Sequence, residues 1–217
     1  MKSELSGERS LVMGYLALRK AIGVLGIALP FVVWVGALVL FGQGTQRTIS
    51  DYYYTGMRDW LVGMLWAIGF FLLSYRGTKP IHDLAGDLAC VFAVCASFLP
   101  TAQEGETSKS ALLIGHIHEA FAFLFFLTLI IFSLVLFTNT EEPLPSAKRH
   151  RNWVYKACGY VMSICLVLSA VLTFLSDRGT LVPEGLNPVF WLETIAIEAF
   201  GISWFIKGYD IELKSSL

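Results

Sequence analysis

The residues best suited to chemistry lie in three short stretches, each at or near one end of an apolar segment. These residues are Arg58 and Asp59, then His116, His118 and Glu119, and finally Glu193 and Glu198. Histidines and carboxylates placed together can relay protons or bind cations, and with enough ligands they can hold zinc. The three stretches therefore predict a polar binding site.

Helical spacing limits which of these side chains can act together. His116 and Glu119 are three residues apart and share a helix face, whereas His118 is turned by about 200° from His116. One of the two histidines must therefore face away from the bundle interior, and the sequence leaves open which one. Glu193 and Glu198 differ by about 140°, so at most one of them points squarely inward.

Six apolar segments must position these residues. The chain has 217 residues, of which 55% are hydrophobic and 15% charged. About 20 apolar residues cross a hydrocarbon core of about 30 Å as a helix, and the runs lack the short alternating pattern of a membrane barrel. We therefore predict an all-α polytopic membrane protein, a six-transmembrane-helix bundle. The predicted spans are 21–41, 57–75, 84–101, 111–138, 153–175 and 188–206.

The basic residues predict the orientation. The chain has 16 Lys and Arg residues, and most of them are predicted on the same side as the N-terminus. The exceptions are Arg47, Arg58, Lys109 and Arg178. The positive-inside rule then places both termini in the cytoplasm and the three polar stretches toward the outside. Residues 1–20 form a cytoplasmic or interfacial segment in which 11–18 lies at the membrane surface. Residues 21–207 form the transmembrane domain, and 208–217 form a cytoplasmic tail.

A second polar feature runs along the third span. Asp87 and Ser97 lie on one helix face together with Asp83, Cys90 and Thr101. Small and hydroxyl-bearing residues let membrane helices approach closely, so this face is either a packing seam or the lining of a polar path through the membrane.

The polar residues allow three interpretations. We favour binding or translocation of a cation, a proton or a lipid headgroup, with His118 titrating beside Glu193 and Arg58 pairing with Asp59 or a headgroup. The alternative is a zinc-dependent hydrolase. The third is a structural subunit without a site, in which the same charged residues merely fix helix packing.

The hydrolase would use His116, His118, Glu119 and Glu193 as zinc ligands and Asp59 as the base. Neither HExxH nor HxxxH occurs in the chain. We therefore expect no bound metal and no cofactor, and we assign no catalytic residue. The charges are segregated rather than clustered into a basic patch, so we expect no nucleic-acid partner. The expected partners are the bilayer, an ion or a lipid headgroup, and a homo-oligomer remains open.

Several short motifs resemble a known group of proteins. They are residues 54–59 (Tyr-Thr-Gly-Met-Arg-Asp), 98–101 (Phe-Leu-Pro-Thr), 115–126 and 193–208. Together they resemble small bacterial membrane proteins of unknown function that are distantly similar to the DRAM-type family, across roughly residues 50–208. The resemblance implies six helices in a bacterial inner membrane and singles out Arg58, Asp59, His118 and Glu193, with no established activity. The CREST membrane hydrolases differ, because they have seven spans and a terminal-helix HxxxH pattern.

Overall fold

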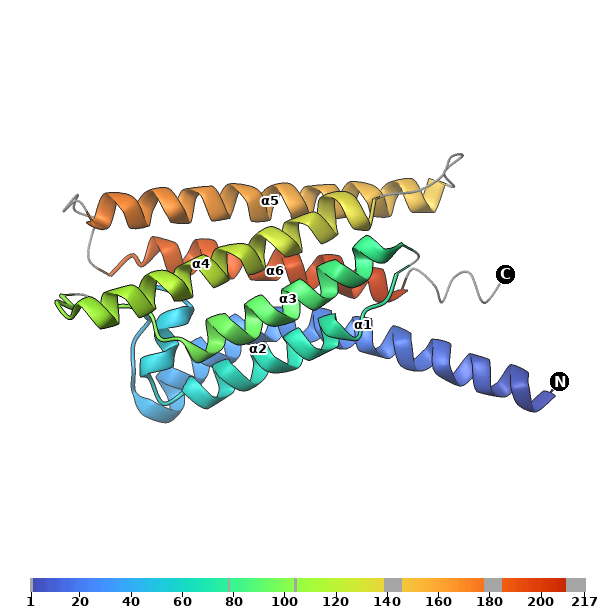
Figure 1. Cartoon of the computed structure of the whole chain (residues 1–217), viewed down its shortest axis with the longest axis horizontal. Coiled ribbons are helices and arrows are strands. Elements are labelled where there is room, and N and C mark those ends of the chain that lie inside the picture. The colour runs from blue at the N-terminus through green and yellow to red at the C-terminus, as the bar shows by residue number, and fades with distance from the viewer. Residues whose placement is uncertain (1, 78, 104, 139–145, 178–184, 210–217) are drawn as a thin grey trace.

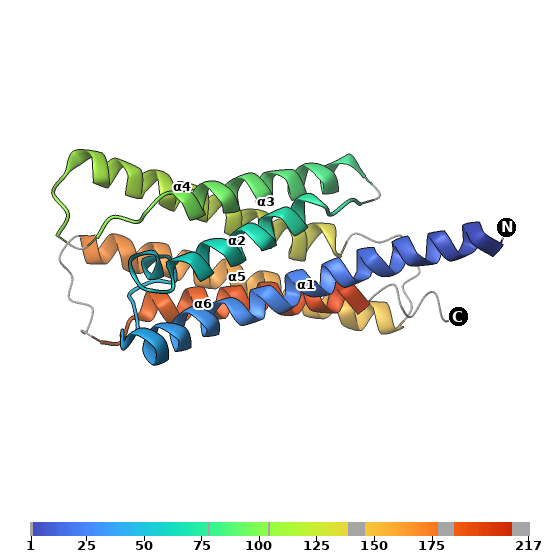
Figure 2. The same cartoon turned by 90° about the horizontal axis from the view of Figure 1, so that it is seen from below.

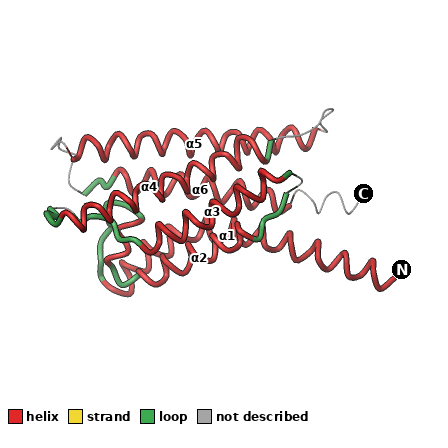
Figure 3. Tube along the Cα trace, in the orientation of Figure 1, coloured by secondary structure: helices red, strands yellow, loops and turns green. Residues whose placement is uncertain are grey.

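The computed structural model describes residues 2–77, 79–103, 105–138, 146–177 and 185–209. Within those residues the chain is helical and has no strand, and short loops join the helices (Figure 3). The elements are α1 Lys2–Phe41, η1 Ser50–Tyr54, α2 Arg58–Leu73, α3 Pro80–Phe98, α4 Lys109–Ile131, η2 Phe132–Leu136, α5 Ser146–Asp177 and α6 Pro188–Tyr209.

Five helices in the described residues are long and apolar enough to cross a membrane. The prediction of a helical membrane bundle is therefore confirmed at that level. α2 is the helix that does not qualify, because it has 16 residues and is only about 24 Å long. The segment Lys109–Leu136 has 28 residues and runs obliquely to α5 (Figure 1).

The first helix differs from the prediction. The sequence analysis separated a surface segment at 11–18 from a span at 21–41, but α1 is one helix of 40 residues. Arg19 and Lys20 are good helix formers and do not interrupt it. The Arg19 side chain, in a residue only 5% exposed, lies 4.9 Å above the Tyr75 ring, so the charge is accommodated inside the bundle. The N-terminal part of α1 projects beyond the other helices (Figures 1 and 2).

The α-helices of the described residues, α1 to α6, form two groups of three. α2, α3 and α4 pack in sequence order, and α5, α6 and α1 form the second group, with α6 between its partners. The packing is thinner where the halves meet, between α1 and α2 and between α4 and α5. Figure 2 shows the two groups as adjacent layers. The α1–α2 seam matters below because a groove lies there.

α1 and α6 approach each other closely through glycines. A β-carbon at Gly23 would lie 2.5 Å from the backbone nitrogen of Phe205, and one at Gly201 would lie 2.7 Å from that of Ile27. Only glycine lets two backbones come this near, which is a usual way for membrane helices to associate. This contact fixes the position of α6, which carries Glu193.

The start of the sixth predicted span agrees with the structure, because α6 begins at Pro188. α3 runs from Pro80 to Phe98, whereas the third span was predicted at 84–101. Proline suits the first position of a helix, where no intrahelical N–H bond is lost. Asn187, which precedes α6, donates from Nδ2 to the Thr45 carbonyl at 3.0 Å. The start of α6 is thereby tied to the loop that follows α1.

Candidate functional site

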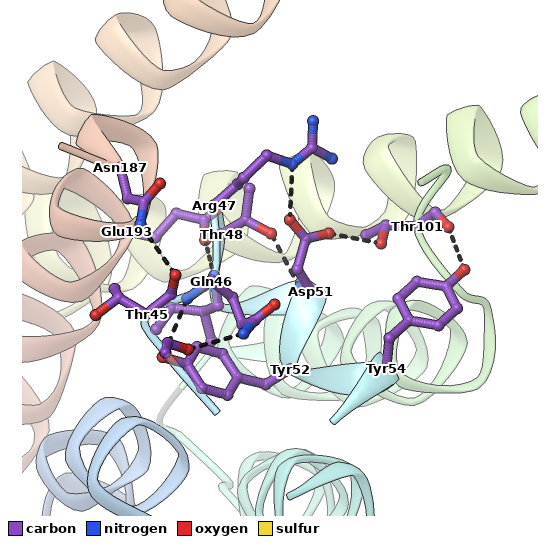
Figure 4. Close-up of polar contacts among 12 residues, drawn as sticks. Thr45, Gln46, Arg47, Thr48, Asp51, Tyr52, Tyr54, Thr101, Asn187 and Glu193 are labelled. Atoms are coloured by element: carbon purple, nitrogen blue, oxygen red, sulfur yellow. Dashed lines mark hydrogen bonds and ion pairs between the residues drawn. The ribbon is translucent and has the colours of Figure 1, made fainter. Parts of the chain in front are cut away.

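The connection between α1 and α2 folds over one end of the bundle. We call residues 42–57 the cap, and they include the short helix η1. Tyr52 anchors the cap, because its ring is fully buried and lies 6.0 Å from the ring of Phe190. The cap is held by polar contacts with the start of α6 and with the α3–α4 connection (Figure 4).

The first of these contacts is made by Glu193, on α6. Its Oε2 accepts a hydrogen bond of 2.6 Å from the backbone N–H of Ile49, a residue that is only 5% exposed. A buried backbone N–H left without an acceptor costs about 1–3 kcal/mol, so this bond stabilises the docked position of the cap. Together with the bond from Asn187 to Thr45, it fastens the cap to the first turns of α6.

Asp51 fastens the cap on its other side. Thr101 donates from Oγ1 to Asp51 Oδ1 at 2.9 Å, and Arg47 Nε lies 3.4 Å from Asp51 Oδ2. Tyr54 donates its hydroxyl to the Thr101 carbonyl at 2.5 Å. The cap therefore bridges α6 and the α3–α4 connection. The sequence analysis did not single out Asp51, although Thr48, whose Oγ1 accepts the Asp51 N–H, marks a local turn.

Two cap tyrosines form hydrogen bonds through their hydroxyls: Tyr54 donates to the Thr101 carbonyl, and Tyr52 accepts the Gln46 N–H at 3.5 Å. Burial raises the pKa of the Tyr52 phenol above its usual value. Burial, reinforced by the carboxylates of Asp51 and Glu106, also raises the pKa of Tyr54. Both phenols are thus protonated well above neutral pH, and their contacts in the cap do not depend on pH there.

Replacing Glu193 by leucine is expected to loosen the cap. The Ile49 N–H would be left buried without an acceptor, at a cost of about 1–3 kcal/mol of unfolding free energy. Glu193→Gln retains an acceptor oxygen and should lose less. Denaturant unfolding in detergent measures the difference, with the exposed Glu119→Leu as a control within about 0.5 kcal/mol of the parent. Equal losses for Glu193→Leu and Glu119→Leu would show that the bond does not hold the cap.

The other predicted site residues do not gather at Glu193. Arg58 is exposed, and its guanidinium donates to the Tyr53 hydroxyl at 2.6 Å and lies 4.2 Å above that ring. Arg58 therefore pairs with an aromatic ring rather than with Asp59 or Glu193. Asp59 is exposed at the start of α2.

The two histidines of α4 have separate roles. His116 is exposed and lies 3.3 Å from Glu119 on the same face, as their spacing predicted. His118 is the buried one, which resolves the question the sequence left open. Its Nδ1 lies 2.8 Å from the carbonyls of both Ala96 and Leu99, so it must carry the proton and donate to them. His118 thus satisfies carbonyls at the end of α3 rather than pairing with Glu193.

Glu198 lies apart from Glu193 on α6. It falls between Ile195 and Ile202, which are 48% and 41% exposed on the outer face of the helix. Its Oε1 is enclosed and has no hydrogen-bond partner among the described residues. The two glutamates therefore face different surroundings, as their angular separation predicted.

The polar face of α3 separates into local contacts. Asp87 Oδ1 forms an ion pair of 2.9 Å with Arg76, and both side chains are about half exposed. Ser97 is buried, accepts a bond of 2.8 Å from Trp66 Nε1 and donates to the Val94 carbonyl. These contacts fit the packing-seam interpretation, since each polar group is engaged by a neighbour within its own end of the bundle.

One groove lies beside a predicted site residue. It has a volume of about 340 Å³ and lies on the α1–α2 seam, with Asp59 as its only ionisable lining residue. The remaining lining is apolar. It consists of Leu25, Trp60, Gly63, Met64 and Ala67. The groove is a shallow, open depression on the helix surface rather than an enclosed cavity.

The residues proposed for a zinc hydrolase are not assembled. Within the described parts of the chain, no group of three His, Cys, Asp or Glu residues is placed to hold a metal ion. His118 is turned toward the end of α3, while His116 and Glu119 point outward from α4. The geometry of these side chains thus gives the hydrolase interpretation no support.

Comparison with protein-family models, curated proteins and solved structures finds no match for this chain. The resemblance to DRAM-type proteins therefore remains a prediction.

Proposed function

We propose that this chain is a multi-pass protein of the bacterial inner membrane that binds a phospholipid with an ammonium headgroup in the α1–α2 groove. The observation that carries the proposal is the groove itself, which combines an apolar wall with the carboxylate of Asp59 at its polar end. An acyl chain matches the wall, and a cationic headgroup matches the carboxylate.

The residues beside the groove favour a zwitterionic lipid. Asp59 would accept charge-assisted hydrogen bonds from the ammonium group, which are among the stronger polar contacts. Arg58, the next residue along the chain and held on Tyr53, is the cation available for the lipid phosphate. A guanidinium group can donate two parallel hydrogen bonds to a phosphate, a bidentate geometry that lysine cannot adopt.

Within the same proposal all six long helices cross the bilayer, with both termini in the cytoplasm. α2 is short but strongly apolar, with charge confined to its first two residues, and it packs along α3. The uneven distribution of Lys and Arg supports the orientation. The groove then opens toward the outer leaflet, because Asp59 stands at the end of α2 nearest the cap.

A lipid site fits the structure better than a translocation path. Glu193 is engaged with the cap, Asp87 with Arg76, and His118 with the end of α3, so these groups do not form a continuous series. Asp59 differs from them because it is exposed and lines a groove.

Neutralising Asp59 tests the proposal. Lipid-depleted protein in detergent is titrated with phosphatidylethanolamine and, separately, with phosphatidylglycerol, and bound lipid is counted by native mass spectrometry. Asp59→Asn is expected to weaken phosphatidylethanolamine binding about tenfold, the effect of losing one charged hydrogen bond. Glu119→Gln, which removes an exposed carboxylate outside the groove, should bind as the parent does. Equal affinity of the parent and Asp59→Asn would refute the headgroup assignment.

A further inference from the structure

α6 carries a carboxyl group at its midpoint. The helix has 22 residues and begins at Pro188, so Glu198 lies about 15 Å along it. Because a hydrocarbon core is about 30 Å thick, Glu198 lies near the membrane centre when α6 crosses the bilayer. A charged side chain is most costly at this depth, and an ionisable residue there is by default a candidate functional site.

Glu198 belongs to the exposed face of α6, which packs between α1 and α5. The large apolar residues on that face are 41–48% exposed, and they are Trp191, Ile195, Ile202 and Tyr209. With Glu198 they follow one another at intervals of three, four or seven residues, which places all five on one side of the helix. We call these five residues the outer face of α6. Its two ends carry a tryptophan and a tyrosine, which are typical of membrane interfaces.

The described parts of the chain do not satisfy the Glu198 carboxyl group. Its Oε1 is enclosed without a hydrogen-bond partner there, although the residue as a whole is partly exposed. Other acidic residues differ, because Glu193 accepts the Ile49 N–H and Asp87 pairs with Arg76. Enclosed polar groups are normally paired. Glu198 therefore calls for a donor that reaches the outer face of α6 from another molecule.

The charge and depth of Glu198 indicate which molecule supplies that donor. Lipid acyl chains have no hydrogen-bond donor. A second copy docked through the same face would place Glu198 against Glu198. Nor could a second copy bring a cation to this depth, since each Lys or Arg in the candidate spans lies within eight residues of one end. A cationic side chain at the midpoint of another protein's helix is complementary in both respects.

We propose that the outer face of α6 binds a transmembrane helix of another protein that carries a lysine or arginine near its midpoint, paired with Glu198. Each charge alone is costly in hydrocarbon, so pairing them favours association of the two helices. Ile195 and Ile202 lie about one turn to either side of Glu198 and supply apolar contact around the pair. The inference requires that α6 crosses the bilayer, and it does not depend on lipid binding in the α1–α2 groove.

The full chain in phosphatidylcholine liposomes, mixed with synthetic transmembrane peptides, tests the proposal. The peptides have about 20 leucine and alanine residues and a dansyl label. One has a central lysine, one a central leucine, and one a lysine two turns from the centre. Energy transfer from the tryptophans of the chain, of which Trp191 lies on the outer face, reports binding. The central-lysine peptide is expected to bind about tenfold more tightly than the other two. Equal binding of all three would overturn the proposal and leave this face to lipid.

Variants locate the effect. Glu198→Gln removes the charge at nearly constant size and should bind the central-lysine and leucine peptides alike. Glu119→Gln, which removes an exposed carboxylate on α4, should keep the parent's preference for lysine. A preference retained by Glu198→Gln would refute the site. Energy transfer between differently labelled copies of the chain, abolished by Glu198→Gln, would assign the face to a second copy and also overturn the proposal. The peptide comparison uses the parent protein, so it decides even if Glu198→Gln folds poorly.

Discussion

Gly63→Leu is expected to remove phosphatidylethanolamine binding almost completely while leaving the fold intact. Gly63 lines the groove, and a β-carbon there would meet no atom within 4 Å. A leucine side chain therefore enters the space that we assign to the acyl chain without displacing protein atoms. Because Gly63 lies inside α2, losing glycine should also stabilise the helix by about 0.5–1 kcal/mol.

Two measurements separate binding from folding in this variant. Native mass spectrometry should show at least a tenfold drop in bound phosphatidylethanolamine, and the unfolding midpoint of lipid-depleted protein should be equal to or above that of the parent. Gly63→Ala fills less of the groove and serves as the graded control. Parent-like lipid binding by Gly63→Leu would place the lipid elsewhere, even if Asp59→Asn had weakened it.

Gly23→Ala should have the opposite effect on stability from Gly63→Ala, although the substitution is chemically the same. The added methyl at Gly23 would lie 2.5 Å from the backbone nitrogen of Phe205, and backbone atoms cannot turn aside as a side chain can. α1 and α6 must therefore separate, at a cost of about 1–3 kcal/mol of unfolding free energy. Separation would also weaken the contacts by which α6 holds the cap.

Denaturant unfolding of the two alanine variants in the same detergent checks this difference. Gly23→Ala should unfold at a lower denaturant concentration than the parent, and Gly63→Ala at the same or a higher one. If the two variants shift together, the close approach of α1 and α6 does not contribute to stability. Gly23→Leu should be more severe still and is expected to lower the yield of folded protein.

The sequence predicted the parts of the fold that depend on local physics. The apolar segments placed the start of the sixth span at residue 188, where α6 begins, and indicated the long fourth segment. The angular argument for His116 and His118 was sound, since one is exposed and the other buried. It could not decide between them, because the choice depends on where the end of α3 presents its free carbonyls.

The contacts of the candidate site were less predictable because they depend on loop conformation. Glu193 was expected to face a histidine, but its partner is a backbone N–H of Ile49, which no pattern of side chains reveals. The contact of Arg19 was missed for a related reason. Arg19 was read as the end of an interfacial segment, whereas packing of α1 against the turn after α2 draws it over Tyr75.

The shortness of α2 has a consequence for the surrounding bilayer. In the topology that we propose, α2 crosses the bilayer, yet at about 24 Å it is shorter than a hydrocarbon core of about 30 Å. Hydrophobic mismatch of this kind is relieved by local thinning of the membrane. We therefore expect a dimple in the leaflet beside α2, where lipids with shorter or more disordered chains collect at the mouth of the groove.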